Sequence, residues 1–307
     1  MGFCRQNIKA LYLENEYRKI EGNFLCLGRQ SVNINVSELE SIFQKSFPSN
    51  KNSIDNVTKH ARLSKEKRIT DKFFLENAFN IKYSSIDLNE YEDASINFDL
   101  NKKIPKKYEN KFDFIFSGGL LDNLFNPSNA LINISKMLKK NGRMLIWEPS
   151  KGLVGSMLNF TPEYFYSYFA VNNFKDFKVY LLTHTKNKKK KKSHFDYLVD
   201  VFSYNPDFTR RKNFDYLKSS KLFNGIHYVM AVVEKGVHST TTKIPVNLHY
   251  LPFVNTKKKQ LIRWDKKKIK SRRKFIGKFD ERFFKIKKKV IKMPYDTDHY
   301  KYLCSDF

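Results

Sequence analysis

The sequence predicts an α/β fold, a Rossmann-like open sheet of about seven strands, mostly parallel with an antiparallel closing strand and helices on both faces. First, short apolar runs alternate with amphipathic helical patterns, which is typical of strand–helix–strand units. Second, residues 112–117, FDFIFS, are almost continuously apolar, as a parallel strand covered on both faces is. Third, no crossover helix is evident after the predicted strand at 177–184, so it and the last strand, 226–236, favour an antiparallel pair.

The helices are predicted from apolar residues that recur at three- and four-residue spacing. They cover residues 9–20, 37–47, 70–79, 128–142 and 161–174. Thr70 or Asp71 is the expected N-cap of one helix, and Thr161 precedes Pro162 at the first position of another. Lysines in the last turn and the Asn-Gly pair at 141–142 predict where the fourth helix ends.

The strands are predicted from short apolar runs bounded by turn residues. They cover residues 23–28, 81–88, 94–99, 112–117, 143–149, 177–184 and 226–236. An open α/β sheet binds its ligand at the carboxyl ends of the parallel strands, so the residues at which strands stop are candidates for a site. These residues are Gly28, Asp87, Asp99, Ser117, Gly118, Gly119 and Glu148.

One α/β domain is expected over residues 1–250, with a polar insertion at about 29–66 and a lysine-rich loop at 186–193. Residues 251–307 form a basic C-terminal extension. The formal net charge of +27 is concentrated, because residues 257–292 hold 18 basic and 3 acidic residues, a net of +15. The lysine-rich loop adds +6, so the rest of the chain is only mildly basic at +6.

The extension contains an apolar stripe on a strongly basic helix, predicted over residues 266–293. Its apolar residues recur every seven positions at Ile269, Ile276, Phe283 and Val290. Such a helix docks on its own domain, contacts a partner, or lies on an anionic membrane surface. RNA contact is not favoured, because the stripe lacks exposed aromatics interleaved with the basic face.

Cysteine usage and hydropathy favour a cytoplasmic protein. Cys4, Cys26 and Cys304 have neither metal-ligand spacing nor the arrangement of a disulfide framework. No apolar run is long enough to span a bilayer, and the first residues lack the apolar core of a signal peptide.

The predicted strand ends carry the groups that a nucleoside needs. Gly28 allows a backbone to approach a ligand, Asp87 can accept from a ribose diol, and Asp99 can meet an adenine amino group. Ser117 and Gly118 would form the floor of the pocket. The glycines after Ser117 are equally well explained as a tight turn with positive φ.

Two other kinds of nucleotide-binding site are not favoured, because their motifs are missing or incomplete. A dinucleotide site needs G-x-G-x-x-G after the first strand and an acid about 20 residues later. The sequence GRQSVN at 28–33 has one glycine, and Asp87 lies far beyond that spacing. The P-loop pattern G-x-x-x-x-G-K-[ST] is also absent from the sequence.

Two longer segments, SSIDLNEYEDASINFDLN and SGGLLDNLFNPSNALINISKMLKKNGRMLIWEP, resemble class I S-adenosylmethionine-dependent methyltransferases, and more narrowly a bacterial branch of them. The first matches D-x-S-x-Y-E-x-A-x-I-x-x-D-L-N, apart from its Ser, and the second matches the branch's G-G-x-L-[ED]-[HN]-x-F pattern and its continuation. The matching residues are Asp87, Tyr91, Glu92, Ala94, Ile96, Asp99, Leu100, Asn101, Gly118, Gly119, Leu121, Asp122, Phe125, Ala130, Leu131, Asn133, Ile134 and Gly142. The resemblance covers roughly residues 20–250.

The resemblance implies S-adenosyl-L-methionine as cofactor and a seven-stranded sheet whose last two strands are antiparallel. It implies that Gly28 lies beneath the methionine part of the cofactor and that Asp87, followed by Leu88, binds the ribose. It also implies that Asp99 and Leu100 contact the adenine, and that Ser117 and Gly118 lie near the sulfonium.

The chain departs from the family at its first motif, [DE]-x-G-x-G-x-G. Cys26 replaces the acid, Gln30 the second glycine and Val32 the third, and Ser117 stands where the branch often has Asp. A non-catalytic, methyltransferase-like binding protein is therefore an alternative.

A hydroxyl or amine acceptor usually needs a general base for methyl transfer. Asp122, Glu148 and His184 are the candidates, because each follows or ends a predicted strand. Asp122 and Glu148 are equally suited to cap the helices that follow them, and His184 to lie at the surface. The favoured function is methyl transfer to a small molecule or saccharide precursor, with an RNA methyltransferase as a further alternative.

Overall fold

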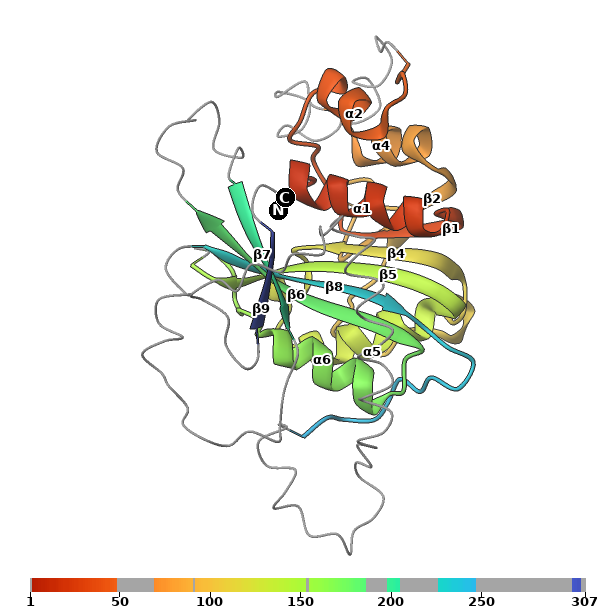
Figure 1. Cartoon of the computed structure of the whole chain (residues 1–307). Coiled ribbons are helices and arrows are strands. Elements are labelled where there is room, and N and C mark those ends of the chain that lie inside the picture. Colours follow the sequence, from red (N-terminus) through yellow and green to blue (C-terminus); the bar gives the residue numbers. More distant parts are fainter. Residues whose placement is uncertain are drawn as a thin grey trace, which may run out of the picture. The chain divides into compact units, whose positions relative to one another are not determined.

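The computed structural model describes residues 2–48, 69–90, 92–152, 155–185, 198–204, 226–246 and 300–304 (Figure 1). The chain divides into two compact units, Met1–Glu148 with 191–196 and Pro149–Lys190 with Tyr197–Phe307. Four expected features lie outside the described residues: the lysine-rich loop, residues 49–66 of the polar insertion, Tyr91 and the basic helical stripe.

The first unit contains a parallel sheet with the strand order β3-β2-β1-β4-β5. The strands are β1 (Glu21–Leu27), β2 (Asn80–Asp87), β3 (Ile96–Asn97), β4 (Phe112–Gly118) and β5 (Leu138–Lys151), which continues three residues into the second unit. β4 is buried at every position except Asp113, so the continuous apolar run did predict a strand covered on both faces.

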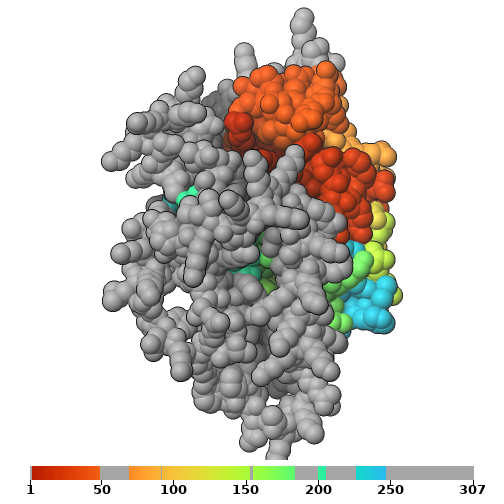
Figure 2. Space-filling model, in the orientation of Figure 1, coloured from red at the N-terminus to blue at the C-terminus, as the bar shows by residue number. Residues whose placement is uncertain are grey.

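Helices cover both faces of this sheet. They are α1 (Arg5–Tyr17), α2 (Val36–Phe43), α4 (Asp71–Ala78) and α5 (Pro127–Met137), with short 3₁₀ helices η2 (Lys106–Tyr108) and η3 (Leu121–Asn123). In Figure 1, α1 and α4 lie on the face opposite to α5. The space-filling view in Figure 2 shows the red and orange surface that α1 and α2 present on this side.

Thr70 is the N-cap of α4, since its hydroxyl accepts a hydrogen bond from Phe73 N at 3.1 Å. Aromatic side chains form the core beneath α4: Phe3 stacks on Phe116 with ring centroids 4.6 Å apart and meets Phe74 edge-on at 5.2 Å. These contacts join the start of the chain to β4 and to α4, and they hold the Phe116 ring in place.

The second unit is antiparallel, with the strand order β8-β6-β7-β9. Its elements are α6 (Pro162–Val171), β6 (Asp176–Thr185), β7 (Leu198–Tyr204), β8 (His227–Glu234) and β9 (Tyr300–Cys304). The antiparallel pair of β6 and β8 confirms the predicted closing strands. Altogether the strands make a mixed, Rossmann-like α/β sheet.

Among the described residues, β7 and β9 are antiparallel strands that come in addition to the predicted ones. β9 lies near the end of the basic C-terminal extension, after the helix predicted at 266–293, and it pairs with β7. None of the helices in the described part of the chain has the length and apolar character to span a bilayer.

The helix predicted to reach residue 142 ends at Met137 instead. The amides of Asn110 and Lys111 bind the carbonyls of Lys136 and Met137 at 2.8 and 2.9 Å, so these carbonyls are satisfied without a further helical turn. The Asn-Gly pair then marks an irregularity inside β5: Asn141 has φ 61°, and a β-carbon at 142 would lie 2.9 Å from Lys139 O.

Candidate functional site

Three strands of the first unit end at the same level. The last residue of β1, Leu27, is in register with Ile86 on β2 and with Ser117 on β4. The residues that follow are Gly28, Asp87 and Gly118, so they form a row along one edge of the sheet. This edge is the candidate site.

Gly28 has φ +70°, a conformation that favours glycine, and its amide donates to Ile86 O at 2.8 Å. A β-carbon placed on Gly28 would lie 3.5 Å from Gln30 Nε2, 3.5 Å from Leu120 Cδ1 and 3.7 Å from Asp87 Oδ2. Side chains from the loops after β1, β2 and β4 therefore converge on Gly28.

Asp87 ends β2 and is partly exposed, and its Oδ1 accepts a hydrogen bond from Leu88 N at 2.7 Å. Oδ2 is the oxygen nearest to Gly28. The next side chain, Leu88, is 64% exposed, which is unusual for a leucine beside a buried strand end. A carboxylate and an apolar side chain are thus presented together at the edge.

Asp99 directs its carboxylate to its own loop: Oδ1 accepts from Asn101 N and from Asn101 Nδ2, both at 2.9 Å. Asn101 Oδ1 in turn accepts from Asn126 N at 2.8 Å, which links the loop after β3 to the start of α5. The Leu100 side chain is buried, and its carbonyl accepts from Asn133 Nδ2 at 3.0 Å. The adenine contacts assigned to Asp99 and Leu100 remain predictions.

Position 118 requires glycine, because there is no room for a side chain there. A β-carbon there would lie 2.7 Å from Cε1 of Phe116, a fully buried ring that is stacked on Phe3. Gly119 is required by its conformation, with φ 78°. The two glycines therefore have different causes, and only the second is the turn residue that the sequence suggested.

Gln30 covers the row between β1 and β4. Its side chain is 4% exposed, and Nε2 donates to Leu27 O at 3.1 Å. The other amide atom, Oε1, would lie 3.3 Å from a β-carbon at Gly118, and no described residue donates a hydrogen bond to it. The sequence identified Gln30 as a departure from a glycine motif but could not say where its side chain lies.

Ser117, Asp122 and Glu148 come together behind this edge. Ser117 Oγ donates to Glu148 Oε1 at 2.6 Å, and the amides of Leu121 and Asp122 donate to the Glu148 carboxylate, both at 3.3 Å. Glu148 is fully buried, and Ser117 and Asp122 are almost so. The group holds the turn between β4 and η3 to the middle of β5.

Burial raises the pKa of Glu148 to about 8; the Ser117 hydrogen bond lowers it, and the nearby Asp122 carboxylate raises it. A carboxyl with this pKa titrates near neutral pH, as an acid–base group must. The third candidate, His184, pairs with Val199 in β6 of the second unit, and its side chain lies outside what the structure describes.

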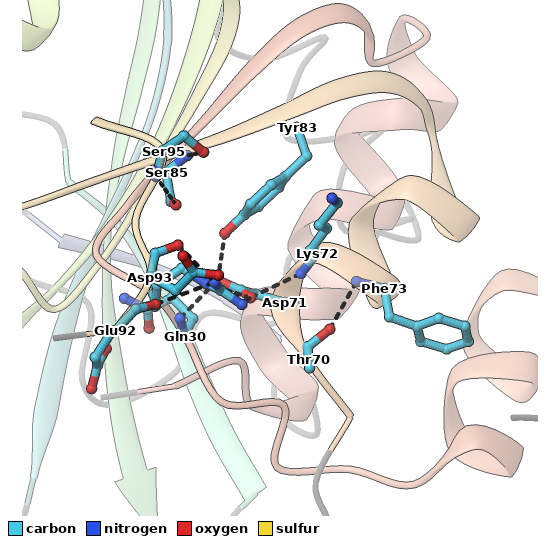
Figure 3. A network of polar contacts seen from close by, with 11 residues as sticks. Gln30, Thr70, Asp71, Lys72, Phe73, Tyr83, Ser85, Glu92, Asp93 and Ser95 are labelled. Carbon is cyan, nitrogen blue, oxygen red and sulfur yellow. Dashed lines mark hydrogen bonds and ion pairs between the residues drawn. The ribbon is translucent and has the colours of Figure 1, made fainter. Parts of the chain in front are cut away.

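A second buried network fixes the loop after β1 (Figure 3). Asp71, at the start of α4, accepts from Arg29 Nε at 3.1 Å, from Gln30 N at 2.9 Å and from the Tyr83 hydroxyl at 2.6 Å. Arg29 Nη1 also donates to the carbonyls of Glu92 and Asp93, both at 3.2 Å. The loops after β1 and β2 are thereby tied together.

The Asp71 network perturbs the groups around it. Burial and then the Asp71 charge raise the pKa of the Tyr83 hydroxyl and of the Cys26 thiol well above their ordinary values. Both groups are therefore neutral at physiological pH. No local pattern indicated this network, because Asp71 was expected only as a possible helix cap and lies 42 residues after Arg29.

Within the described segments, no three His, Cys, Asp or Glu side chains gather in a way that could hold a metal ion.

No family model matches the chain. Among curated proteins, it is 27% identical over 161 residues to "Probable polyketide synthase 17" of Dictyostelium discoideum. That match spans 51% of this chain but only 5% of the much longer polyketide synthase.

Among solved structures, the chain is similar to a SAM-dependent methyltransferase from Archaeoglobus fulgidus, with 12% identity, coverage of 75% of this chain and 94% of that chain, and a TM-score of 0.38. The [4+2]-cyclase SpnF has 12% identity, coverage of 75% and 80%, and a TM-score of 0.36. A phosphoethanolamine N-methyltransferase 2 from Haemonchus contortus has 11% identity, coverage of 74% and 53%, and a TM-score of 0.38. Likenesses of this strength add nothing to the fold established by the strand order.

Proposed function

We propose that the chain is an S-adenosylmethionine-dependent methyltransferase whose cofactor lies along the row of Gly28, Asp87 and Gly118. One observation carries the proposal: the register of β1, β2 and β4 brings the Asp87 carboxylate beside Gly28 at the carboxyl ends of parallel strands. A ribose diol needs such an acceptor next to a backbone that it can approach closely.

The side chains at this edge suit a nucleoside. Asp87 Oδ2 has no hydrogen-bond donor among the described residues, so it can accept from the ribose hydroxyls. The exposed Leu88 offers an apolar surface to the nucleoside, whose burial against it is favourable. Asp99 Oδ2 lies 4.0 Å from Lys102 Nζ and can accept from the adenine amino group.

When bound, the cofactor supplies the electrophilic methyl group, and the protein has to orient the reactants and exclude water. In this proposal Ser117 and Gly118 lie near the sulfonium, and Glu148 is a positioning residue that fixes Ser117 and the turn at 121–122. Asp122, Glu148 and His184 all remain candidates for a general base.

The departures at the first motif fit the proposal if other groups do the work of the missing acid and glycines. Cys26 is neutral and cannot replace the carboxylate of the motif. The nearby Asp71 carboxylate, however, accepts a hydrogen bond from Gln30 N and orders the loop. The loop is therefore rigid although two of its three motif glycines are absent.

We propose a small molecule as the methyl acceptor, more narrowly a saccharide precursor, and the cytoplasm of a bacterium as the place where the protein acts.

A non-catalytic binding protein is the second candidate. It is favoured by the Gln30 side chain, which is almost fully buried at the place where the motif has a glycine. RNA methylation would depend on basic segments that lie outside the described residues.

Calorimetry with S-adenosylhomocysteine, the demethylated product, tests the proposal. The wild-type chain is expected to bind it, and Asp87→Ala to bind about 10- to 100-fold more weakly, because a hydrogen bond to a charged group is lost. Glu76→Gln, at an exposed position of α4, is the matched control and keeps the wild-type affinity. A folded wild-type chain that binds neither this ligand nor S-adenosylmethionine at millimolar concentration would leave the second candidate.

A further inference from the structure

Of the two polar atoms of the Gln30 side-chain amide, one is hydrogen-bonded to a described residue and the other is not. Nε2 donates to Leu27 O at 3.1 Å, whereas Oε1 has no partner within the part of the chain that the structure describes, although Gln30 is only 4% exposed. A buried carbonyl oxygen without a donor is costly, and most such groups in folded proteins have a partner. The site therefore lacks a donor that belongs next to Gln30.

The backbone does not let this side chain swing away freely. Gln30 N is bound to Asp71 Oδ2 at 2.9 Å, and the neighbouring Arg29 is paired with the same carboxylate (Figure 3). The backbone N–H and the side-chain Nε2 of Gln30 therefore both donate hydrogen bonds, to Asp71 and to Leu27 O. As a result, Oε1 keeps a defined direction toward Gly118.

The position of Oε1 selects which part of the cofactor it faces. Asp87, the proposed ribose ligand, is on β2, whereas Gly118 is on β4, and β1 lies between these two strands. Oε1 points to the β4 side, away from the ribose. Of the donors in S-adenosylmethionine, the ribose hydroxyls and the adenine amino group belong to the nucleoside, so the remaining donor is the α-ammonium group of the methionine part.

We propose that Gln30 Oε1 accepts a hydrogen bond from the α-ammonium group of the bound cofactor. Gln30 then binds the cofactor and does not block its site. The inference rests on the proposed function and deepens it. The residue that breaks the glycine motif then contributes to cofactor recognition, and it makes binding depend on the amino acid part of the ligand.

Two ligands and one substitution test this directly by calorimetry. S-adenosylhomocysteine carries the ammonium group, and 5′-methylthioadenosine has the same nucleoside and thioether without the amino acid part. Gln30→Met keeps the length of the side chain but removes the acceptor. It is expected to weaken S-adenosylhomocysteine binding at least tenfold and to change methylthioadenosine binding less than twofold.

A test on the wild-type chain avoids any effect of substitution on folding. S-adenosylhomocysteine without its α-amino group is expected to bind at least tenfold more weakly than the parent compound. Equal affinity for the two compounds, or equal weakening of both ligands in Gln30→Met, overturns the inference. If Gln30→Met binds S-adenosylhomocysteine more tightly than the wild type does, the Gln30 side chain blocks the site and the inference is overturned. Wild-type protein that binds none of these ligands overturns the proposed function itself, whereas binding without discrimination overturns only the role of Gln30.

Discussion

Asp71 and Glu148 are both buried carboxylates in the first unit, but their partners differ. Asp71 faces the guanidinium of Arg29, with an N–O distance of 3.0 Å, and a hydroxyl and backbone amides complete its hydrogen bonds. The recorded partners of Glu148 are one hydroxyl and two backbone amides, all of them neutral. Asp71 therefore acts as one half of a buried ion pair, while Glu148 holds its loop as a group that titrates near neutral pH.

The two sides of the candidate site are therefore held in place by different kinds of interaction. The loops after β1 and β2 are held by a buried charge pair. The turn after β4 is held by a carboxyl group whose pKa is raised to about 8, so its charge changes near neutral pH. Three substitutions probe these two sides of the site.

The largest effect is expected for Asp71→Asn. It leaves the Arg29 guanidinium, of which 8% is exposed, without its counter-charge, so the free energy of unfolding should fall by about 3–5 kcal/mol. Urea unfolding measures the loss. The matched control is Glu16→Gln, which removes an ion pair whose side chains are 71% and 51% exposed, and it should cost less than about 1 kcal/mol. Similar losses in both variants would contradict the contrast.

The next effect is a pH dependence that belongs to Glu148. Its pKa is raised from 4.5 to about 8 in the folded chain, so the folded state holds a proton that the unfolded state releases. Stability from this group is complete below about pH 4.5 and is lost as the pH rises through 8. Between pH 5 and pH 8 the wild-type chain should lose about 2–4 kcal/mol.

Glu148→Gln should remove this slope, whatever constant cost the substitution adds. Urea unfolding of both chains at pH 5, 6, 7 and 8 compares the slopes. A variant that retains the wild-type slope would show that another group titrates.

The smallest effect is expected for Gly118→Ala. Its β-carbon would lie 2.7 Å from the buried Phe116 ring, and the resulting overpacking should cost about 1–3 kcal/mol. Gly155→Ala is the comparison, because nothing lies within 4 Å of its β-carbon and only its φ of +97° opposes a side chain. Thermal unfolding ranks the two variants. A Gly118→Ala chain as stable as wild type would contradict the close contact with Phe116.

The sequence was sufficient to predict the parallel strands and, to within one residue, the carboxyl ends of β1, β2 and β4, whereas β3 ends two residues before the predicted Asp99. β4 is buried on both faces, so its apolar run has a simple cause, and Asp87 ends β2 within one residue of the predicted boundary. Strand ends are readable because hydrophobicity changes there. The proximity of Ser117, Asp122 and Glu148 follows from the predicted order of strands, although the hydrogen bonds between them do not.

The remaining features depend on contacts between distant parts of the chain. The end of α5 at Met137 is set by amides of residues 110–111, which no local pattern encodes. The direction of the Gln30 side chain depends on the backbone at Leu27 and on the space above Gly118. β9 pairs with β7 across about a hundred residues, and its sequence reads as the end of a basic tail.

Arg29 holds the loop after β2 through the carbonyl oxygens of Glu92 and Asp93, and every amino acid provides such an oxygen. The identities of these two residues are therefore open to change during evolution, within the limit that φ 54° sets at position 93. New side chains could be sampled beside the proposed nucleoside edge while the backbone that carries them stays in place.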